Sequence, residues 1–180
     1  GNLLTGLQDP YYDGGSQYTV AQFIYGNGIG YRADKIDSAD LIAQGYDSMW
    51  NPAYKGRLAV PDSYRDTISL ALFQAGITDV NTTDAATITA AQENLIRLRD
   101  ATQPKVDILS YQEIPAGNRD IAYMWSGDIL IAPWNLPEGT STDVLGFWYP
   151  EQTITANDFL CIPKESKAPV LAHRFINYLL

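Results

Sequence analysis

The sequence has little of what most catalytic and metal sites are built from, since it contains one cysteine, Cys161, and one histidine, His173. One cysteine excludes a disulfide framework within the chain and a cysteine-rich metal site. A single histidine gives little support to a catalytic triad or a zinc site. Cys161 lies in an apolar run, so we expect a buried, inert thiol. We therefore expect no metal ion and no cofactor.

Positive charge is also scarce. The chain contains 12 Lys and Arg residues and 21 Asp and Glu residues, so its net charge is −9. Proteins that bind nucleic acid need basic patches, so we exclude a nucleic-acid partner. An acidic chain instead attracts cationic ligands, because net charge steers diffusion.

Long apolar runs are missing as well. No run approaches the length of a membrane span, and no basic segment followed by an apolar one opens the chain as in a signal peptide. The first residues, Gly1 to Leu4, contain no initiator Met. We interpret them as a cut edge that processing or cloning has left.

What is present is an alternation of predicted strands and helices. The 180 residues, 46% of them hydrophobic, suffice for one domain or two small lobes. Apolar patterning predicts strands at 18–25, 57–60, 106–109, 121–125, 144–149 and 153–162, and helices at 38–44, 64–75, 84–101 and 169–180. Glycines 26, 28 and 30 are expected to let the backbone turn tightly or approach a ligand. The alternation predicts an α/β fold with a partly parallel sheet.

One stretch, Asp120 to Asp128, combines a buried strand with a polar turn. Apolar residues run into Trp125, and Ser126, Gly127 and Asp128 follow before an apolar helical run. In open α/β sheets, ligands sit outside the carboxyl ends of strands. An indole face beside the Asp128 carboxylate suits an organic cation. A core Trp with Ser126 or Asp128 capping a helix explains the stretch equally well, and both interpretations stay open at this point.

A second polar group opens the helix predicted at 64–75. Capping by Asp62 or Ser63 is the favoured interpretation, and Asp62, Ser63 and Asp66 pointing into a cleft is the alternative. Asp62 and Asp66 are spaced i, i+4, which would also suit a carboxylate-dependent hydrolase. No nucleophile motif accompanies them, so the hydrolase is the weaker hypothesis.

Several stretches together resemble the spermidine/putrescine-binding proteins of bacterial ABC transporters. The resemblance covers nearly the whole chain from about residue 18. The stretches that carry it, in chain order, are Tyr18–Val20 with 26–31, 51–66 with its Pro-Ala-Tyr-Lys-Gly motif, 81–84, Trp125–Asp128, and 158–164 with 172–180.

The resemblance implies a periplasmic-binding-protein-like fold of type II, a mixed sheet flanked by helices with an incomplete first lobe. Residues 1–29 would be an entry segment and crossing strand, 30–135 the second lobe, and 136–180 a return strand and part of the first lobe. It implies a small-molecule ligand held between lobes, hinge closure, and delivery to a membrane permease. It also implies a periplasmic or extracellular location, as an anchored lipoprotein in a Gram-positive cell, and no enzymatic activity.

The resemblance assigns five ligand contacts. Trp125 falls on an aromatic that stacks on the polyamine chain, and Asp158 on a carboxylate that pairs with an amine. Thr19 falls on a hydroxyl contact, Asp66 on an acidic position of the second lobe, and Ser63 where the family can place an Asp. Asp128 joins this set from the turn after Trp125.

Three departures from the family pattern bear on the ligand. Thr155-Ala156-Asn157 stands where the family usually has a second Trp just before the Asp158 position, Ala21-Gln22 replaces a Pro-Tyr pair, and Ser63 lacks the charge of an Asp. Each lost cation–π contact is worth about 0.5–2 kcal/mol. We therefore expect a smaller or less charged amine, or a different small solute. Half a cleft supplies half the contacts, so this chain alone is expected to bind weakly or not at all. Open strand edges make self-association a further expectation.

Overall fold

The computed structural model describes residues 3–180, so the predicted cut edge at Gly1 and Asn2 lies partly outside the described residues. The chain forms two compact units. The larger unit is Gly26–Ile154, and the smaller unit combines Gly1–Tyr25 with Thr155–Leu180. The lobe boundaries implied by the resemblance, at residues 29/30 and 135/136, stay a prediction.

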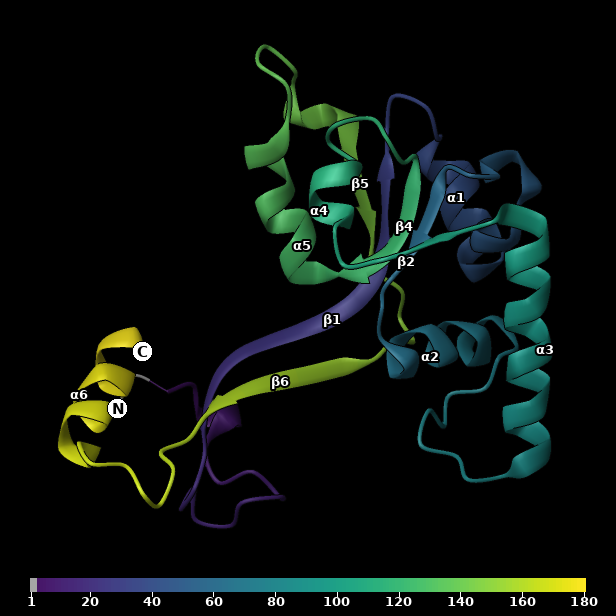
Figure 1. Ribbon diagram of the computed structural model, residues 1–180. Coiled ribbons are helices and arrows are strands. Elements are labelled where there is room, and N and C mark those ends of the chain that lie inside the picture. Colours follow the sequence, from purple (N-terminus) through teal and green to yellow (C-terminus); the bar gives the residue numbers. More distant parts are fainter. Residues whose placement is uncertain (1–2) are drawn as a thin grey trace. The chain divides into compact units, whose positions relative to one another are not determined.

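The larger unit is built on a mixed sheet with the strand order β3-β2-β4-β1-β5 (Figure 1). The strands of this sheet are β1 (Val20–Arg32), which belongs to the larger unit from Gly26 on, β2 (Leu58–Val60), β3 (Lys105–Val106), β4 (Ile121–Trp125) and β5 (Leu145–Trp148). β2 runs parallel to β3 and β4, whereas β1 runs antiparallel to β4 and β5. The predicted partly parallel sheet is confirmed.

Side chains of β4 alternate between two apolar clusters, because successive residues of a strand point to opposite faces. Ile121 and Tyr123 pack with Ile29 in a cluster that also holds Leu70 and Leu98. On the other face, Ala122 and Met124 pack with Ile114. Helices therefore cover both faces of the sheet, as Figure 1 shows.

Helices lie close to their predicted bounds. The larger unit contains α1 (Ser38–Gln44), α2 (Tyr64–Gln74), α3 (Ala85–Thr102), α4 (Ser110–Glu113) and α5 (Ser126–Ile131). Asp37 caps α1 and Asp84 caps α3 through side-chain hydrogen bonds. Ala91 and Leu98 of α3 are buried as predicted. Ile88 is 44% exposed because it borders a surface hollow beside Ile68 and Leu72.

The predicted turn at glycines 26, 28 and 30 is wrong, because all three lie inside the 13-residue strand β1. A Cβ on Gly28 would overlap the ring of Phe147, and one on Gly30 would overlap the sulfur of Met124. These glycines therefore make room for neighbouring side chains of the sheet.

The strand predicted at 106–109 is shorter than expected. β3 ends at Val106, and the Asp107 carboxylate accepts the backbone N–H of Leu109, which turns the chain. Ile108 and Leu109 are consequently exposed.

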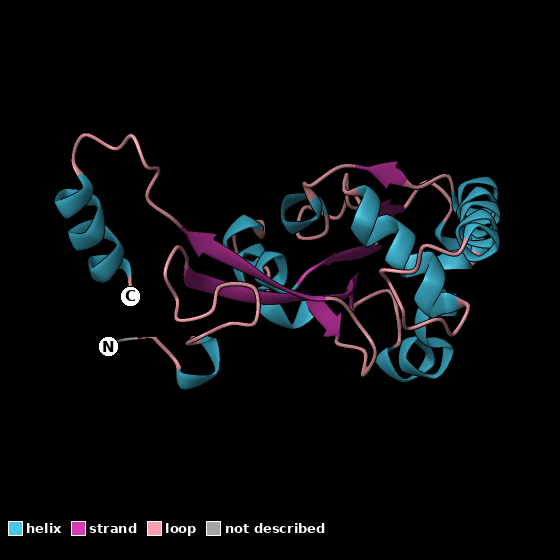
Figure 2. Cartoon of the chain, turned by 90° about the horizontal axis from the view of Figure 1, so that it is seen from below, coloured by secondary structure: helices cyan, strands magenta, loops and turns pink. Residues whose placement is uncertain are grey.

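In the smaller unit, β6 (Thr155–Leu160) pairs with β1 and leads through a loop to α6 (Pro169–Leu179) (Figure 2). The apolar side of α6, predicted to be buried, is exposed at Leu171, Phe175 and Leu179. The described residues of this unit place no element over it. Cys161, also predicted to be buried, is exposed. It follows β6 directly and borders a surface hollow, so an apolar sequence context did not bury it.

None of the helices described in residues 3–180 combines the length and the apolar character that crossing a membrane requires.

Candidate ligand-binding site

The carboxyl end of β4 brings two predicted site residues together. Trp125 is the last residue of β4 and is half-buried. Its indole Nε1 donates a 3.2 Å hydrogen bond to Oδ2 of Asp66, in the first turn of α2. The bond sets an aromatic ring and a carboxylate side by side at the end of a strand.

Two further side chains of the same cluster, Tyr123 and Ser69, were missed by sequence reasoning. Tyr123 lies two residues before Trp125 and so on the same face of the sheet. Its hydroxyl is 3.5 Å from Oγ of Ser69, which donates to the backbone oxygen of Asp66 at 2.7 Å. Burial raises the pKa of Tyr123 to about 12, so its hydroxyl is neutral at physiological pH. The period-2 spacing of Tyr123 and Trp125 was the available signal.

Asn27 of β1 is the third residue that was missed. It pairs directly with Trp125 in the antiparallel register, and it is fully buried. Thr153 Oγ1 donates to the backbone oxygen of Asn27 at 2.7 Å, and the Asn27 N–H donates to the oxygen of Ile154 at 3.2 Å. Its side-chain amide makes no hydrogen bond of regular geometry with the described residues.

The turn after Trp125 carries a half-buried carboxylate. Burial raises the pKa of Asp128 to about 6, against a smaller opposing effect of a hydrogen bond with the backbone of Trp125. Ser126 accepts the backbone N–H of Gly26 at 3.2 Å, so it ties this turn to β1. The N-cap of α5 is Trp125, so Ser126 does not cap this helix, whereas Asp128 in the first turn bonds back to the backbone of Trp125, as a capping carboxylate does.

Ser63 occupies the N-cap position of α2 but makes no side-chain capping bond, so the capping interpretation is wrong here too. Asp62 precedes that position and is exposed. Because α2 begins at Tyr64, Asp62 and Asp66 do not share a helical face, and the spacing argument for a hydrolase loses its basis.

Thr19 and Asp158 both lie in the smaller unit. The Thr19 hydroxyl donates to Oδ2 of Asp13 at 2.8 Å. Burial raises the pKa of Asp13, but hydrogen bonds from Tyr18, Thr19 and Gln17 outweigh it and hold this pKa below its ordinary value. Asp158 is exposed on β6. The approach of Thr19 and Asp158 to Trp125 stays a prediction.

The smaller unit also contains a surface hollow of about 320 Å3, which Cys161 and His173 border together. Across residues 3–180, no three His, Cys, Asp or Glu side chains are grouped so that they would hold a metal ion.

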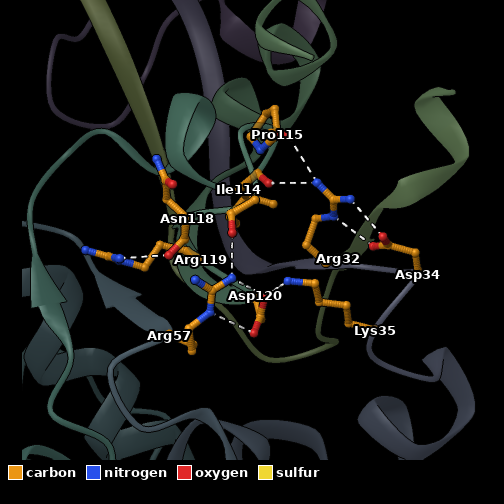
Figure 3. A network of polar contacts seen from close by, with 10 residues as sticks. Arg32, Asp34, Lys35, Arg57, Ile114, Pro115, Asn118, Arg119 and Asp120 are labelled. Atoms are coloured by element: carbon orange, nitrogen blue, oxygen red, sulfur yellow. Dashed lines mark hydrogen bonds and ion pairs between the residues drawn. The ribbon is translucent and has the colours of Figure 1, made fainter. Parts of the chain in front are cut away.

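At its other end, β4 is fixed by an ion-pair network around Asp120 (Figure 3). Asp120 accepts hydrogen bonds from Arg57 Nε at 3.0 Å, Arg57 Nη2 at 2.8 Å and Lys35 Nζ at 2.7 Å. Arg57 and Arg32 also donate to backbone carbonyls of Gly117 and Pro115. Since these cations are engaged with carboxylates and loop carbonyls, the network anchors the strand that presents Trp125.

A family model described as bacterial extracellular solute-binding protein matches residues 4–180. The chain belongs to this family. The resemblance found in the sequence is confirmed, and a periplasmic or extracellular location agrees with the family's description.

Known relatives align with nearly the whole of this chain. The spermidine/putrescine-binding periplasmic protein of Escherichia coli K12 is 29% identical over 184 residues, covering 99% of this chain and 49% of the relative. The spermidine/putrescine-binding periplasmic protein 1 of Haemophilus influenzae is 28% identical over 180 residues, covering 94% and 45%. The structure titled a putative spermidine/putrescine ABC transporter from Listeria monocytogenes superposes with a TM-score of 0.80 at 21% identity, covering 98% and 52%.

The periplasmic-binding-protein-like fold is thereby confirmed. The chain spans about half the length of the curated relatives it matches, which agrees with an incomplete first lobe.

Proposed function

We propose that the chain is part of the substrate-binding component of an ABC importer, which captures a polyamine-like organic cation and delivers it to a membrane permease. The observation that carries this proposal is the hydrogen bond between Trp125 and Asp66 at the carboxyl end of β4. The names of the E. coli and H. influenzae relatives support it.

The chemistry of the cluster suits an alkylammonium group. Asp66 offers a carboxylate, and Trp125 offers an indole face, each favouring a cation; a cation–π contact is worth about 0.5–2 kcal/mol. The acidic chain, with a net charge of −9, favours the encounter.

Asp158 and Thr19 are proposed to contribute from the smaller unit, and Ser63 and Asp128 from the larger one. Ala156 and Ser63 stand where the family pattern has an aromatic and a carboxylate, so the preferred ligand is a short diamine. A different small solute is the alternative. The proposed role is binding, with no catalytic step.

The test is a calorimetric titration of the full-length protein with putrescine, cadaverine, spermidine, 4-aminobutyrate and glucose. We expect micromolar affinity for a diamine, which corresponds to about −8 kcal/mol. Trp125→Ala should weaken it at least tenfold, whereas Trp134→Ala, at a position 83% exposed, should leave it unchanged. Binding of glucose or an anion without binding of any amine would refute the polyamine part of the proposal.

A further inference from the structure

Among residues 3–180, the side chain of Asn27 is a buried polar group beside Trp125 that has no hydrogen bond of regular geometry. Asn27 is 0% exposed, and neither its Nδ2 nor its Oδ1 has a partner of regular geometry among the described residues. A buried amide left unpaired destabilises a fold, and such groups are rare in native proteins. A polar group kept at such a cost commonly serves a function.

The position of Asn27 is well defined by its strand. Its backbone is hydrogen-bonded to Thr153 and Ile154, and the neighbouring Gly26 N–H is bonded to Ser126. Opposite residues of an antiparallel pair project to the same face, so the Asn27 side chain shares its face with Trp125 and, diagonally, with Tyr123. The amide therefore belongs to the cluster that holds Asp66.

The surroundings of Asn27 also set how its amide is oriented. The side chains of Ser69, Thr153 and Asn27 all lie near enough to the Tyr123 hydroxyl to lower its pKa, although burial dominates and raises it. The neutral Tyr123 hydroxyl suits the amide N–H2 as an acceptor. With the amide N–H2 on the Tyr123 side, the Asn27 carbonyl oxygen is free to accept a further hydrogen bond on the face that Asn27 shares with Trp125.

We infer that Asn27 is a specificity-determining residue of this site, whose side-chain oxygen accepts an N–H of the ligand's primary ammonium group while Asp66 takes its charge. The inference rests on the proposed function and deepens it. A primary ammonium has three N–H donors, so one can serve Asp66 and another Asn27, whereas a quaternary ammonium has none. Because Asn27 is buried, this contact requires the half-buried Trp125 opposite it to move aside when the ligand enters.

The test compares Asn27→Leu with a matched control in the full-length protein. Leucine has a similar volume and removes the unpaired amide, so the melting temperature should stay equal or rise. Affinity for the best diamine should fall at least tenfold. Asn94→Leu is the control, because Asn94 is also buried but its amide donates to Ala71 and Gln74. That variant should lose thermal stability and keep its diamine affinity.

A second titration uses putrescine and its quaternary analogue with trimethylammonium ends. The wild-type protein should prefer putrescine at least tenfold, and Asn27→Leu should lose most of this preference. Asn27→Ala gives the same test if the leucine variant does not fold.

Unchanged affinity and unchanged preference in a folded Asn27 variant would overturn the inference while leaving the proposed function intact. A wild-type protein that binds no amine would instead overturn the proposed function and the inference together.

Discussion

The indole nitrogen of Trp125 donates a 3.2 Å hydrogen bond to the carboxylate of Asp66, and this bond joins the end of β4 to the first turn of α2. The two residues are 59 positions apart in the sequence. Their contact places an aromatic face next to a negative charge, which is the combination that an organic cation requires.

We expect Trp125→Phe to keep an aromatic ring and lose this hydrogen bond. The free energy of unfolding should fall by about 1 kcal/mol, the usual net worth of such a bond. Asp66→Asn should cost a similar amount, and the double variant should cost less than the sum of the two, because both remove the same interaction. Urea denaturation measures all three. Strict additivity would show that the bond does not stabilise the fold.

Asp128 should make stability depend on pH between about 4 and 6. Its pKa in the folded protein is about 6, above the ordinary 3.8, so the folded state binds the proton more tightly. Its contribution is therefore fully present below pH 3.8 and is lost as the pH rises through 6. Asp128→Asn should raise the free energy of unfolding at pH 7.5 by about 1–2 kcal/mol, less than the full shift implies because the group is partly solvated.

The same substitution should have almost no effect at pH 3.5, where the carboxyl is protonated in both states. Asp143→Asn, at an exposed position, is the control and should change little at either pH. An Asp128→Asn effect of equal size at both pH values would contradict this prediction.

Asp120 should make the protein more stable at neutral pH than in acid, which is the opposite of the effect expected for Asp128. Hydrogen bonds from Arg57, opposed by burial and assisted by Lys35, hold its pKa below the ordinary value. Its stabilising effect is therefore present above the ordinary carboxyl pKa and is lost as the pH falls through the lowered one. Asp120→Asn should cost about 1–2 kcal/mol at pH 7 and flatten the acid limb of the stability curve.

Thermal unfolding followed from pH 2 to 8 would measure this effect. Asp100→Asn removes a carboxylate from an exposed pair with Arg99 and is the matched control. An acid limb as steep in Asp120→Asn as in the wild type would exclude Asp120 as its source.

Gly28→Ala should be strongly destabilising. The added Cβ would overlap the ring of Phe147 and the backbone oxygen of Trp148, which lies in the neighbouring strand. Overpacking of this kind costs about 1–3 kcal/mol. Gly127→Ala adds a methyl group where no atom lies within 4 Å, so its effect should stay within about 0.5 kcal/mol. Chemical denaturation measures the free energy of unfolding of both variants. Equal values would show that the sheet tolerates the extra carbon at Gly28.

The 180-residue chain by itself should bind a diamine at least tenfold more weakly than the full-length protein, because it supplies only part of the contacts. It should also associate with itself, since α6 exposes Leu171 and Phe175 at 66% and 58%. Calorimetry measures the first property and analytical ultracentrifugation the second. Equal affinities of the 180-residue chain and the full-length protein would contradict the first expectation. A chain that stays strictly monomeric at roughly 100 μM, a concentration at which weak association is seen, would contradict the second.

Local patterning was enough to predict most of the elements. Helices α2 and α3 follow from apolar periodicity and from the residues at their ends, which are interactions between near neighbours. The predictions from the sequence were wrong where contacts with residues far away in the sequence determine the local structure. Glycines 28 and 30 look like turn residues, yet Phe147 and Met124 require them in a strand. Cys161 has an apolar context, yet it is exposed.

The candidate ligand residues also fall into those that the sequence pointed to and those that only the structure brings together. Trp125 and Asp66 were found from chemistry at a strand end and from the family resemblance. Asn27 and Ser69 were not, because nothing in their own neighbourhoods along the chain distinguishes them from core or surface residues, and Tyr123 was marked only by its period-2 spacing from Trp125. They become a cluster only through the pairing of β1 with β4 and the packing of α2 on that sheet.

By itself, the sequence determined the family, the α/β class and the aromatic-acidic character of the site, since composition and short-range pattern are properties of contiguous residues. Only the tertiary structure decided which polar groups meet at the end of β4, and that the side-chain amide of Asn27 has no hydrogen bond of regular geometry with the described residues. Strand register and helix packing set those contacts, and both depend on residues far apart in the chain.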